Sequence, residues 1–155
     1  MNFKNGYLCL LFLAMSGSTL ATTTSVSNTH EYKLDNGLKL IVREDHRSPI
    51  VVTQVWYKVG ASFEPNGITG ISHALEHMMF RGTTNHPKDA FSRLIAIGGG
   101  DQNAFTTSDF TAYFQELDAD RLKLCFELEA DRMVNLTLPE EAFKQEIKVV
   151  MEERR

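Results

Sequence analysis

Two histidines and a glutamate occupy positions 73, 76 and 77 in the pattern His-x-x-Glu-His. On an α-helix, which turns by about 100° per residue, His73, Glu76 and His77 share one arc, and imidazoles one turn apart can bind a tetrahedral Zn²⁺. Glu76, just before the second histidine, can act as a general base toward water at the metal. An isolated histidine pair is better interpreted as an exposed polar helix face. The complete pattern is more specific because each member has a chemical role.

A catalytic zinc site needs a third protein ligand. Residues 140–155 have helical periodicity, and there Glu146 and Glu153 lie two turns apart on an apolar stripe, whereas Glu152 lies off it. The apolar members of this stripe are Phe143, Val149 and Val150. A carboxylate on a buried stripe is costly unless its charge is compensated, which favours Glu153 as a ligand and Glu146 in a supporting place beside it. Spacing alone leaves open an i, i+7 pair on an exposed surface.

Hydrophobic patterning predicts the elements that position these residues. Alternating apolar residues and the turn Asp35-Asn36-Gly37 predict a β-hairpin or two short strands over 31–44, and β-branched and aromatic residues predict a central strand over 50–59. Further strands are expected over 102–107 and 110–117, and helices over 71–80, 87–97, 118–134 and 140–155. The fold class is therefore α+β, a mixed or antiparallel β-sheet with packed helices.

The same patterning predicts the core. In the helix over 71–80, the arc opposite the histidines should bury against the sheet, and its members are Ile71, Leu75, Met78 and Met79. Trp56 and Phe80 are expected in the core. Cys125 is expected as a small buried hydrophobe on one stripe with Leu122, Phe126 and Met133.

Composition limits the class of protein. The 155 residues are 43% hydrophobic and 23% charged, with 16 basic and 20 acidic side chains, which indicates a globular protein and argues against nucleic-acid binding. Lys4, the apolar run over 7–15 and small residues ending at Ala21 predict a signal peptide over 1–21, followed by a flexible lead-in over 22–30. The run is too short to span a bilayer, so we expect export to the periplasm or medium without stable membrane insertion after cleavage. An uncleaved anchor is the alternative.

The sequence resembles the N-terminal part of the pitrilysin/insulinase family of zinc metallopeptidases, the inverzincins, which includes the mitochondrial processing peptidases. The resemblance covers nearly all of residues 31–155. It rests on HALEHMMFRGT at 73–83, NAFT at 103–106, DFTAY at 109–113, EADRM at 129–133 and a glutamate 76 residues after the second histidine. It implies one Zn²⁺ on His73, His77 and Glu153, with Glu76 as the base and Glu146 as the acidic residue seven positions before the third ligand.

The family resemblance also implies a substrate and missing parts. Asn103, Ala104, Phe105 and Thr106 match an edge strand along which an extended peptide lies, because an exposed edge offers unpaired backbone groups. Family members are longer, built from repeated α/β domains whose C-terminal half supplies transition-state groups. Since the predicted helix over 140–155 has no stop signal, we expect residues 31–155 to be an N-terminal metallopeptidase domain, truncated, and the first half-domain of such a protein.

The resemblance leaves two functions to be separated. In the first, the parent protein is a zinc endopeptidase or oligopeptidase, and this chain binds zinc but is weakly active or inactive without its C-terminal domains or a partner subunit. In the second, the chain is a non-catalytic zinc-binding scaffold or a partner subunit that presents peptides. The presence of every motif residue favours the first.

Overall fold

The computed structural model describes residues 28–155, which form two units that are treated separately here: the described residues up to Asp45, and His46–Arg155. The first unit is a hairpin of β1 (Thr29–Lys33) and β2 (Lys39–Arg43), paired antiparallel from Thr29↔Arg43 to Lys33↔Lys39. Its turn contains Gly37 at a φ of 88°, where a glycine is favoured. The predicted hairpin is confirmed, and β1 begins at Thr29, inside the expected lead-in. The predicted signal peptide lies outside the described residues.

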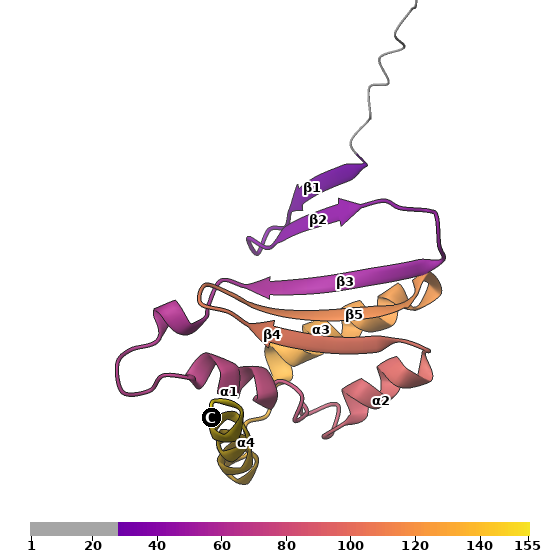
Figure 1. Ribbon diagram of the computed structural model, residues 1–155. Coiled ribbons are helices and arrows are strands. Elements are labelled where there is room, and N and C mark those ends of the chain that lie inside the picture. The colour runs from indigo at the N-terminus through magenta and orange to yellow at the C-terminus, as the bar shows by residue number, and fades with distance from the viewer. Residues whose placement is uncertain (1–27) are drawn as a thin grey trace, which may run out of the picture. The chain divides into compact units, whose positions relative to one another are not determined.

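The second unit is built on a three-stranded antiparallel sheet of β3 (Ile50–Tyr57), β4 (Asp101–Thr106) and β5 (Thr111–Asp118) (Figure 1). Their order is β3-β5-β4, so β5 is the central strand, and the prediction that residues 50–59 form a central strand is wrong for this sheet. Strand propensity reports how well a side chain suits a pleated surface, and it does not tell an edge strand from a central one.

Four α-helices complete this unit: α1 (Ile71–Met78), α2 (Ala90–Ile97), α3 (Leu122–Asn135) and α4 (Glu140–Glu153). Short 3₁₀ turns, η1 (Ala61–Phe63) and η2 (Ala119–Arg121), precede α1 and α3. Helix α2 begins three residues later than predicted, because residues 87–89 form a turn in which Asp89 adopts a φ of 64°. None of the described helices has both the length and the apolarity that a membrane span requires.

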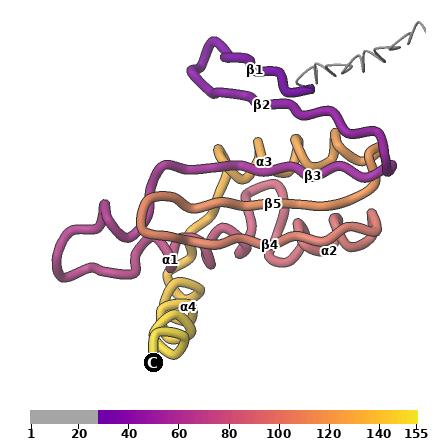
Figure 2. Tube along the Cα trace, turned by 45° about the horizontal axis from the view of Figure 1, so that its top comes forward, coloured from indigo at the N-terminus to yellow at the C-terminus, as the bar shows by residue number. Residues whose placement is uncertain are grey.

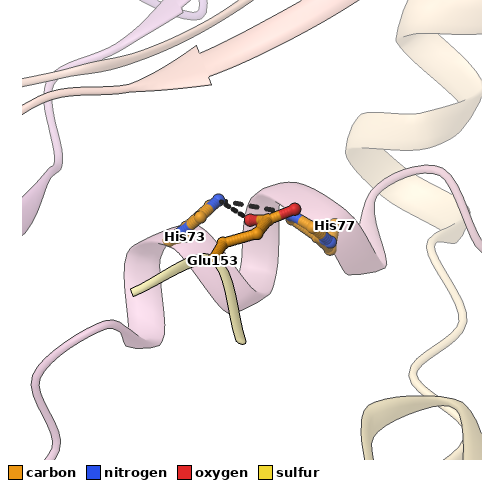
Figure 3. A group of neighbouring side chains, drawn as sticks. All are labelled: His73, His77 and Glu153. Carbon is orange, nitrogen blue, oxygen red and sulfur yellow. Dashed lines mark hydrogen bonds and ion pairs between the residues drawn. The ribbon is translucent and has the colours of Figure 1, made fainter. Parts of the chain in front are cut away.

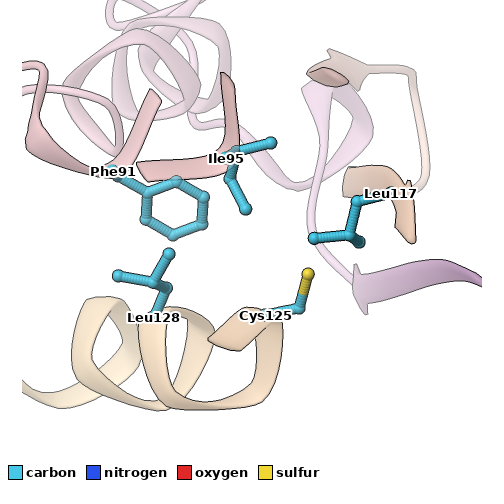
Figure 4. Close-up of a cluster of buried hydrophobic side chains, with 5 residues drawn as sticks. All are labelled: Phe91, Ile95, Leu117, Cys125 and Leu128. Carbon is cyan, nitrogen blue, oxygen red and sulfur yellow. The ribbon is translucent and has the colours of Figure 1, made fainter. Parts of the chain in front are cut away.

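The core lies between the sheet, α2 and α3. Phe91 and Ile95 from α2 face Cys125 and Leu128 from α3, and Leu117 of β5 closes the cluster (Figure 4). Cys125 is fully buried as predicted, and this burial raises the pKa of its thiol. The predicted stripe around it is wrong, because Phe126 and Met133 are exposed.

A polar chain takes the place of that predicted stripe. Thr53 of β3 donates a hydrogen bond to Gln115 of β5, which in turn donates to Glu129 of α3. Glu129 pairs with Arg132, whose guanidinium lies 4.3 Å from the ring centroid of Tyr113. Because these buried groups bond one another, α3 can present polar side chains to the sheet, although Arg132 Nη1 has no hydrogen-bond partner within residues 28–155.

The opposite face of the sheet is apolar but open. Trp56 is 52% exposed and meets the ring of Phe105 edge-on at 6.0 Å. The prediction that Trp56 belongs to the core is therefore wrong: along β3 it alternates with Val55 and Tyr57, whose side chains are half-buried. Phe80, in contrast, packs on Tyr113 and Arg132, as expected for a core residue.

Helix α4 stands apart from the sheet and packs on α1 (Figures 1 and 2). Helix α1 in turn also contacts β4. The arrangement therefore brings the last described helix and the sheet edge to two sides of the helix that carries His73, Glu76 and His77.

Candidate metal centre

The N-terminus of α1 is held by the loop before it. Gly70, at a φ of 95°, turns the chain into the helix, and the two carboxylate oxygens of Glu64 accept hydrogen bonds from the N–H groups of Gly70 and Ser72, at 2.6 and 2.8 Å. The Gly70 hydrogen bond is the main reason why the pKa of Glu64 lies below its usual value. The turn that carries His73 is thereby fixed.

His73, His77 and Glu153 form one cluster, although Glu153 comes from α4. The Nε2 atoms of the two histidines are 3.1 Å apart, and Glu153 Oε2 lies 3.3 Å from His73 Nε2 and 3.5 Å from His77 Nε2. Figure 3 shows the carboxylate reaching both rings. Among residues 28–155, these three are the one set of His, Cys, Asp or Glu side chains whose donor atoms all lie within 4.8 Å of one another.

The spacing of these atoms suits a single zinc ion. Ligand atoms about 2.0–2.1 Å from a tetrahedral Zn²⁺ lie about 3.3–3.4 Å from each other, and the three observed separations bracket that value. Two imidazoles and one carboxylate are also a donor set of catalytic zinc centres, which keep a fourth position open. Two imidazole nitrogens at 3.1 Å cannot both present lone pairs to each other without a proton or a cation between them. The residues present therefore fit the metal.

Helix α4 presents Glu153, and not Glu152, to the histidines. Glu152 instead pairs with Arg155, 2.8 Å away, so the helical phase predicted from the sequence is confirmed. The predicted apolar stripe is too wide, because Val150 is buried whereas Val149 is 43% exposed. Since α4 packs mainly on α1, it buries a narrower face than a helix lying on a sheet.

Glu146 supports His77 from behind. It is 3% exposed, and its Oε2 lies 3.0 Å from His77 Nδ1. An ionised carboxylate only accepts hydrogen bonds, so this contact keeps a proton on Nδ1 and leaves the Nε2 lone pair for the cluster. Arg81 donates to the other oxygen of Glu146. Sequence reasoning selected Glu146 but missed Arg81, for which the available signal was its i+4 spacing from His77.

Glu76 faces the sheet edge. It is 9% exposed, and its Oε2 accepts a hydrogen bond from the Thr106 hydroxyl of β4. The predicted apolar arc of α1 is only partly correct: Met78 is buried, but Ile71 and Leu75 are 41% and 43% exposed. The helix buries the sides that meet α4 and β4, including polar residues, because those contacts compensate the polar groups.

The segment predicted to bind substrate forms most of β4. Among the described residues, β4 pairs with β5 on one side only, from Asp101↔Glu116 to Thr106↔Thr111, so no second strand pairs with the backbone groups of its other edge. Ala104 and Thr106 are half-buried, whereas Asn103 and Phe105 are exposed. The expectation of an edge strand beside the His-x-x-Glu-His helix is therefore confirmed for this part of the chain, while substrate binding stays a prediction.

The loop after α1 is tied to α3 through Asp131, a role that sequence reasoning missed. Its carboxylate accepts hydrogen bonds from the side chains of Thr83, Asn85 and Asn135 and pairs with His86, 2.9 Å away. Burial alone would raise the pKa of Asp131, but these partners together hold it well below its usual value. These contacts fix the segment between α1 and α2. Thr83, Asn85 and His86 lie 45–48 residues before Asp131 in the sequence, so their contacts with it could not be predicted from the sequence.

Comparison with known proteins identifies relatives of this chain. A "Zinc protease PqqE" of Helicobacter pylori is 34% identical over 149 residues, which are 96% of this chain and 34% of that protein. The "Cytochrome b-c1 complex subunit 1, mitochondrial" of Bos taurus is 31% identical over 83% of this chain and 27% of its own length. A crystal structure of a protease from Helicobacter pylori superposes with a TM-score of 0.79 at 35% identity, covering 84% of this chain and 31% of that one.

The chain thus spans between about a quarter and a third of the length of these two curated relatives. The family model of the insulinases, peptidase family M16, matches residues 39–155, which include every residue of the cluster. Some relatives are named as zinc proteases, and others are named as subunits of the mitochondrial cytochrome b-c1 complex. The chain is an α+β protein that belongs to the insulinase family, peptidase family M16.

Proposed function

We propose that this chain carries the metal-binding and proton-accepting part of a zinc peptidase active site. His73, His77 and Glu153 hold one Zn²⁺, and Glu76 is the general base. The observation that carries the proposal is the convergence of three donor atoms, from two helices, at separations that suit one zinc ion.

Each residue near the cluster has a part in the proposed reaction. Bound Zn²⁺ supplies Lewis acidity, which polarises a peptide carbonyl and acidifies water. The Glu76 carboxylate accepts the proton released when water attacks that carbonyl, while the Thr106 hydroxyl bonds its other side and limits its motion. Glu146 and Arg81 hold the His77 ring in one orientation.

An extended peptide is the substrate that β4 suits. A peptide added along this edge pairs its backbone with the N–H and C=O groups of β4 that do not pair with β5, whatever its side chains are. Because Thr106 bonds Glu76, the strand that binds the backbone also holds the base. Cleavage at this edge explains why the base is on the helix face that meets the strand.

We propose further that full activity belongs to a longer protein. Its remaining domains, or a partner subunit, would supply the groups that stabilise the tetrahedral intermediate, which are usually among the largest contributions to catalysis. The length of the relatives supports this proposal. The second candidate, a non-catalytic scaffold or peptide-presenting subunit, has in its favour the similarity to a cytochrome b-c1 subunit, but this chain keeps the complete motif.

The substitution Glu76→Gln in the whole protein separates the two candidates. It keeps the size of the side chain but removes the proton acceptor, so peptide cleavage should fall by about 10²–10⁴-fold while zinc content stays at the parental level. The matched control is Glu116→Gln, an exposed glutamate of β5 outside the cluster, which should leave both unchanged. A parent protein that binds zinc and peptide but cleaves nothing would support the scaffold instead.

A further inference from the structure

A chain of two threonine hydroxyls leads from Glu76 into the sheet. Thr106, the last residue of β4, donates its hydroxyl hydrogen to Glu76 Oε2. Its Oγ1 lies 3.2 Å from Oγ1 of Thr111, the first residue of β5. Thr111 Oγ1 in turn lies 3.0 Å from the carbonyl oxygen of Val59, which it bonds as a donor. We call Thr106 and Thr111 the threonine pair.

The sheet itself places the threonine pair. Thr106 and Thr111 are directly opposite each other at the end of the ladder between β4 and β5, where opposed side chains lie on the same face and contact one another. The turn beyond them is closed by a hydrogen bond from the Thr107 N–H to the Phe110 carbonyl oxygen, at 2.8 Å. The Ala61 N–H also donates to the Thr107 carbonyl oxygen, at 3.1 Å. The backbone on both sides of the pair is therefore fixed.

The number of hydroxyl hydrogens sets the direction of this chain. An ionised carboxylate only accepts hydrogen bonds, so the single hydroxyl hydrogen of Thr106 points at Glu76. Two hydroxyl oxygens 3.2 Å apart form a hydrogen bond only when one of them supplies a hydrogen, and Thr111 is the one left to do so. Thr111 thus shares its hydrogen between Thr106 Oγ1 and the Val59 carbonyl oxygen.

Donation from Thr111 strengthens the contact between Thr106 and Glu76. Hydrogen bonds in a chain polarise one another, so the Thr106 hydroxyl is a better donor while it accepts from Thr111. Thr111 is 3% exposed and Glu76 is 9% exposed, so water has little access to replace either partner. Within residues 28–155, Thr106 is the one side chain that is hydrogen-bonded to the Glu76 carboxylate. The orientation of that carboxylate therefore depends on the threonine pair.

We propose that Thr111 is a positioning residue, which acts on Glu76 through Thr106. The inference rests on the proposed function, in which Glu76 is the general base. Because Thr106 bonds Oε2, the Oε1 atom is left to accept the proton. That proton leaves the attacking water as the water oxygen bonds the carbonyl carbon of the peptide. Oε2 accepts from Thr106 before and after the transfer, so the carboxylate stays aligned throughout.

Steady-state kinetics of the whole protein on one peptide test this role. Thr111→Val keeps the branched shape and the strand preference of the side chain but removes its hydroxyl. It should lower kcat several-fold, and Thr106→Val, which removes the hydrogen bond to the charged carboxylate itself, should lower kcat at least about tenfold. KM should stay within about twofold of the parental value in both variants, because the backbone of β4 is unchanged.

Serine variants and a control separate the hydroxyl from the fold. Thr111→Ser and Thr106→Ser keep the hydroxyl, so kcat should stay within about threefold of the parental value. Thr84→Val makes the same change at an exposed threonine outside the pair and should match the parent. Zinc content should equal the parental value in all five variants. A rise in KM at unchanged kcat would assign Thr111 to peptide binding and would contradict the proposal.

A second measurement needs neither turnover nor metal. In the metal-free 155-residue chain, the carbon chemical shift of the Glu76 carboxyl group reports its hydrogen bonding. It should move in Thr106→Val, move in the same direction by a smaller amount in Thr111→Val, and stay at the parental value in Thr84→Val. A shift that is unchanged in both variants of the pair would overturn the hydrogen-bond chain.

The Glu76→Gln variant distinguishes failure of this role from failure of the proposed function. With the base removed, Thr111→Val should cause no further loss of the residual rate, and a further several-fold loss would contradict a role that runs through Glu76. If Glu76→Gln loses cleavage while Thr111→Val keeps the parental kcat, the positioning role alone is refuted. If Glu76→Gln cleaves at the parental rate, or the parent cleaves nothing, the proposed function fails and the positioning role fails with it.

Discussion

Replacing Arg81 by methionine would leave the buried carboxylate of Glu146 with His77 as its remaining side-chain partner. The side chain of Glu146 is 4% exposed and that of Arg81 is 27% exposed. Breaking a buried ion pair from one side costs about 3–5 kcal/mol, because the remaining charge stays desolvated. Water can reach the space vacated by a partly exposed guanidinium, so we expect Arg81→Met to lower the free energy of unfolding by about 2–3 kcal/mol.

A double-mutant cycle with Glu146→Gln measures whether this loss comes from the pair. In the Glu146→Gln background position 146 carries no charge that could be left buried without a partner. There, Arg81→Met should lower the free energy of unfolding by less than about 1 kcal/mol. Urea denaturation of the metal-free chain at pH 7, followed by circular dichroism, gives the four free energies. Arg155→Met is the control, since it removes an arginine from an exposed pair with Glu152 and should cost less than about 1 kcal/mol. Additive effects of the two substitutions, within about 0.5 kcal/mol, would refute the reasoning.

Two other predictions concern acid stability and export. The pKa of Asp131 is held low in the folded chain, so its contribution to stability is complete above the unfolded value of about 4 and is lost as the pH falls through the folded pKa. Urea midpoints of the parent should therefore fall more steeply below pH 4 than those of Asp131→Asn, and parallel curves would contradict this. We propose that the protein is exported, because Lys4, the apolar run over 7–15 and Ala21 have the pattern of a signal peptide. N-terminal sequencing of exported material should begin near Thr22, and material that keeps Met1 would count against cleavage.

The local part of the site could be predicted from the sequence. The positions of His73, Glu76 and His77 on one helix follow from the 3.6-residue period, and the choice of Glu153 over Glu152 follows from the same period applied to α4. The hairpin and the paired strands around Asn103–Thr106 followed from alternation and turn residues. In each case the information lies within one element.

The contacts between elements could not be predicted in the same way. Arg81 and Glu146 are 65 residues apart, and the i+4 spacing of Arg81 from His77 is the one sequence feature that bears on their contact. The exposure of Trp56 and the burial of Arg132 also depend on tertiary contacts, since strand and helix patterns predict two faces but not which face is covered. The burial of the Glu129–Arg132 pair, between aromatic rings and a sheet, reverses the usual expectation for charged residues.

Calorimetric titration of the metal-free chain with Zn²⁺ tests the central claim most directly. We predict one ion per chain, no stoichiometric binding after His73→Ala or His77→Ala, and a loss of affinity for Glu153→Gln that exceeds the roughly 10–100-fold typical of a supporting partner. Glu152→Gln, one residue away on the same helix, should bind like the parent. No stoichiometric zinc binding, or a larger effect for Glu152→Gln than for Glu153→Gln, would contradict a zinc site built from His73, His77 and Glu153.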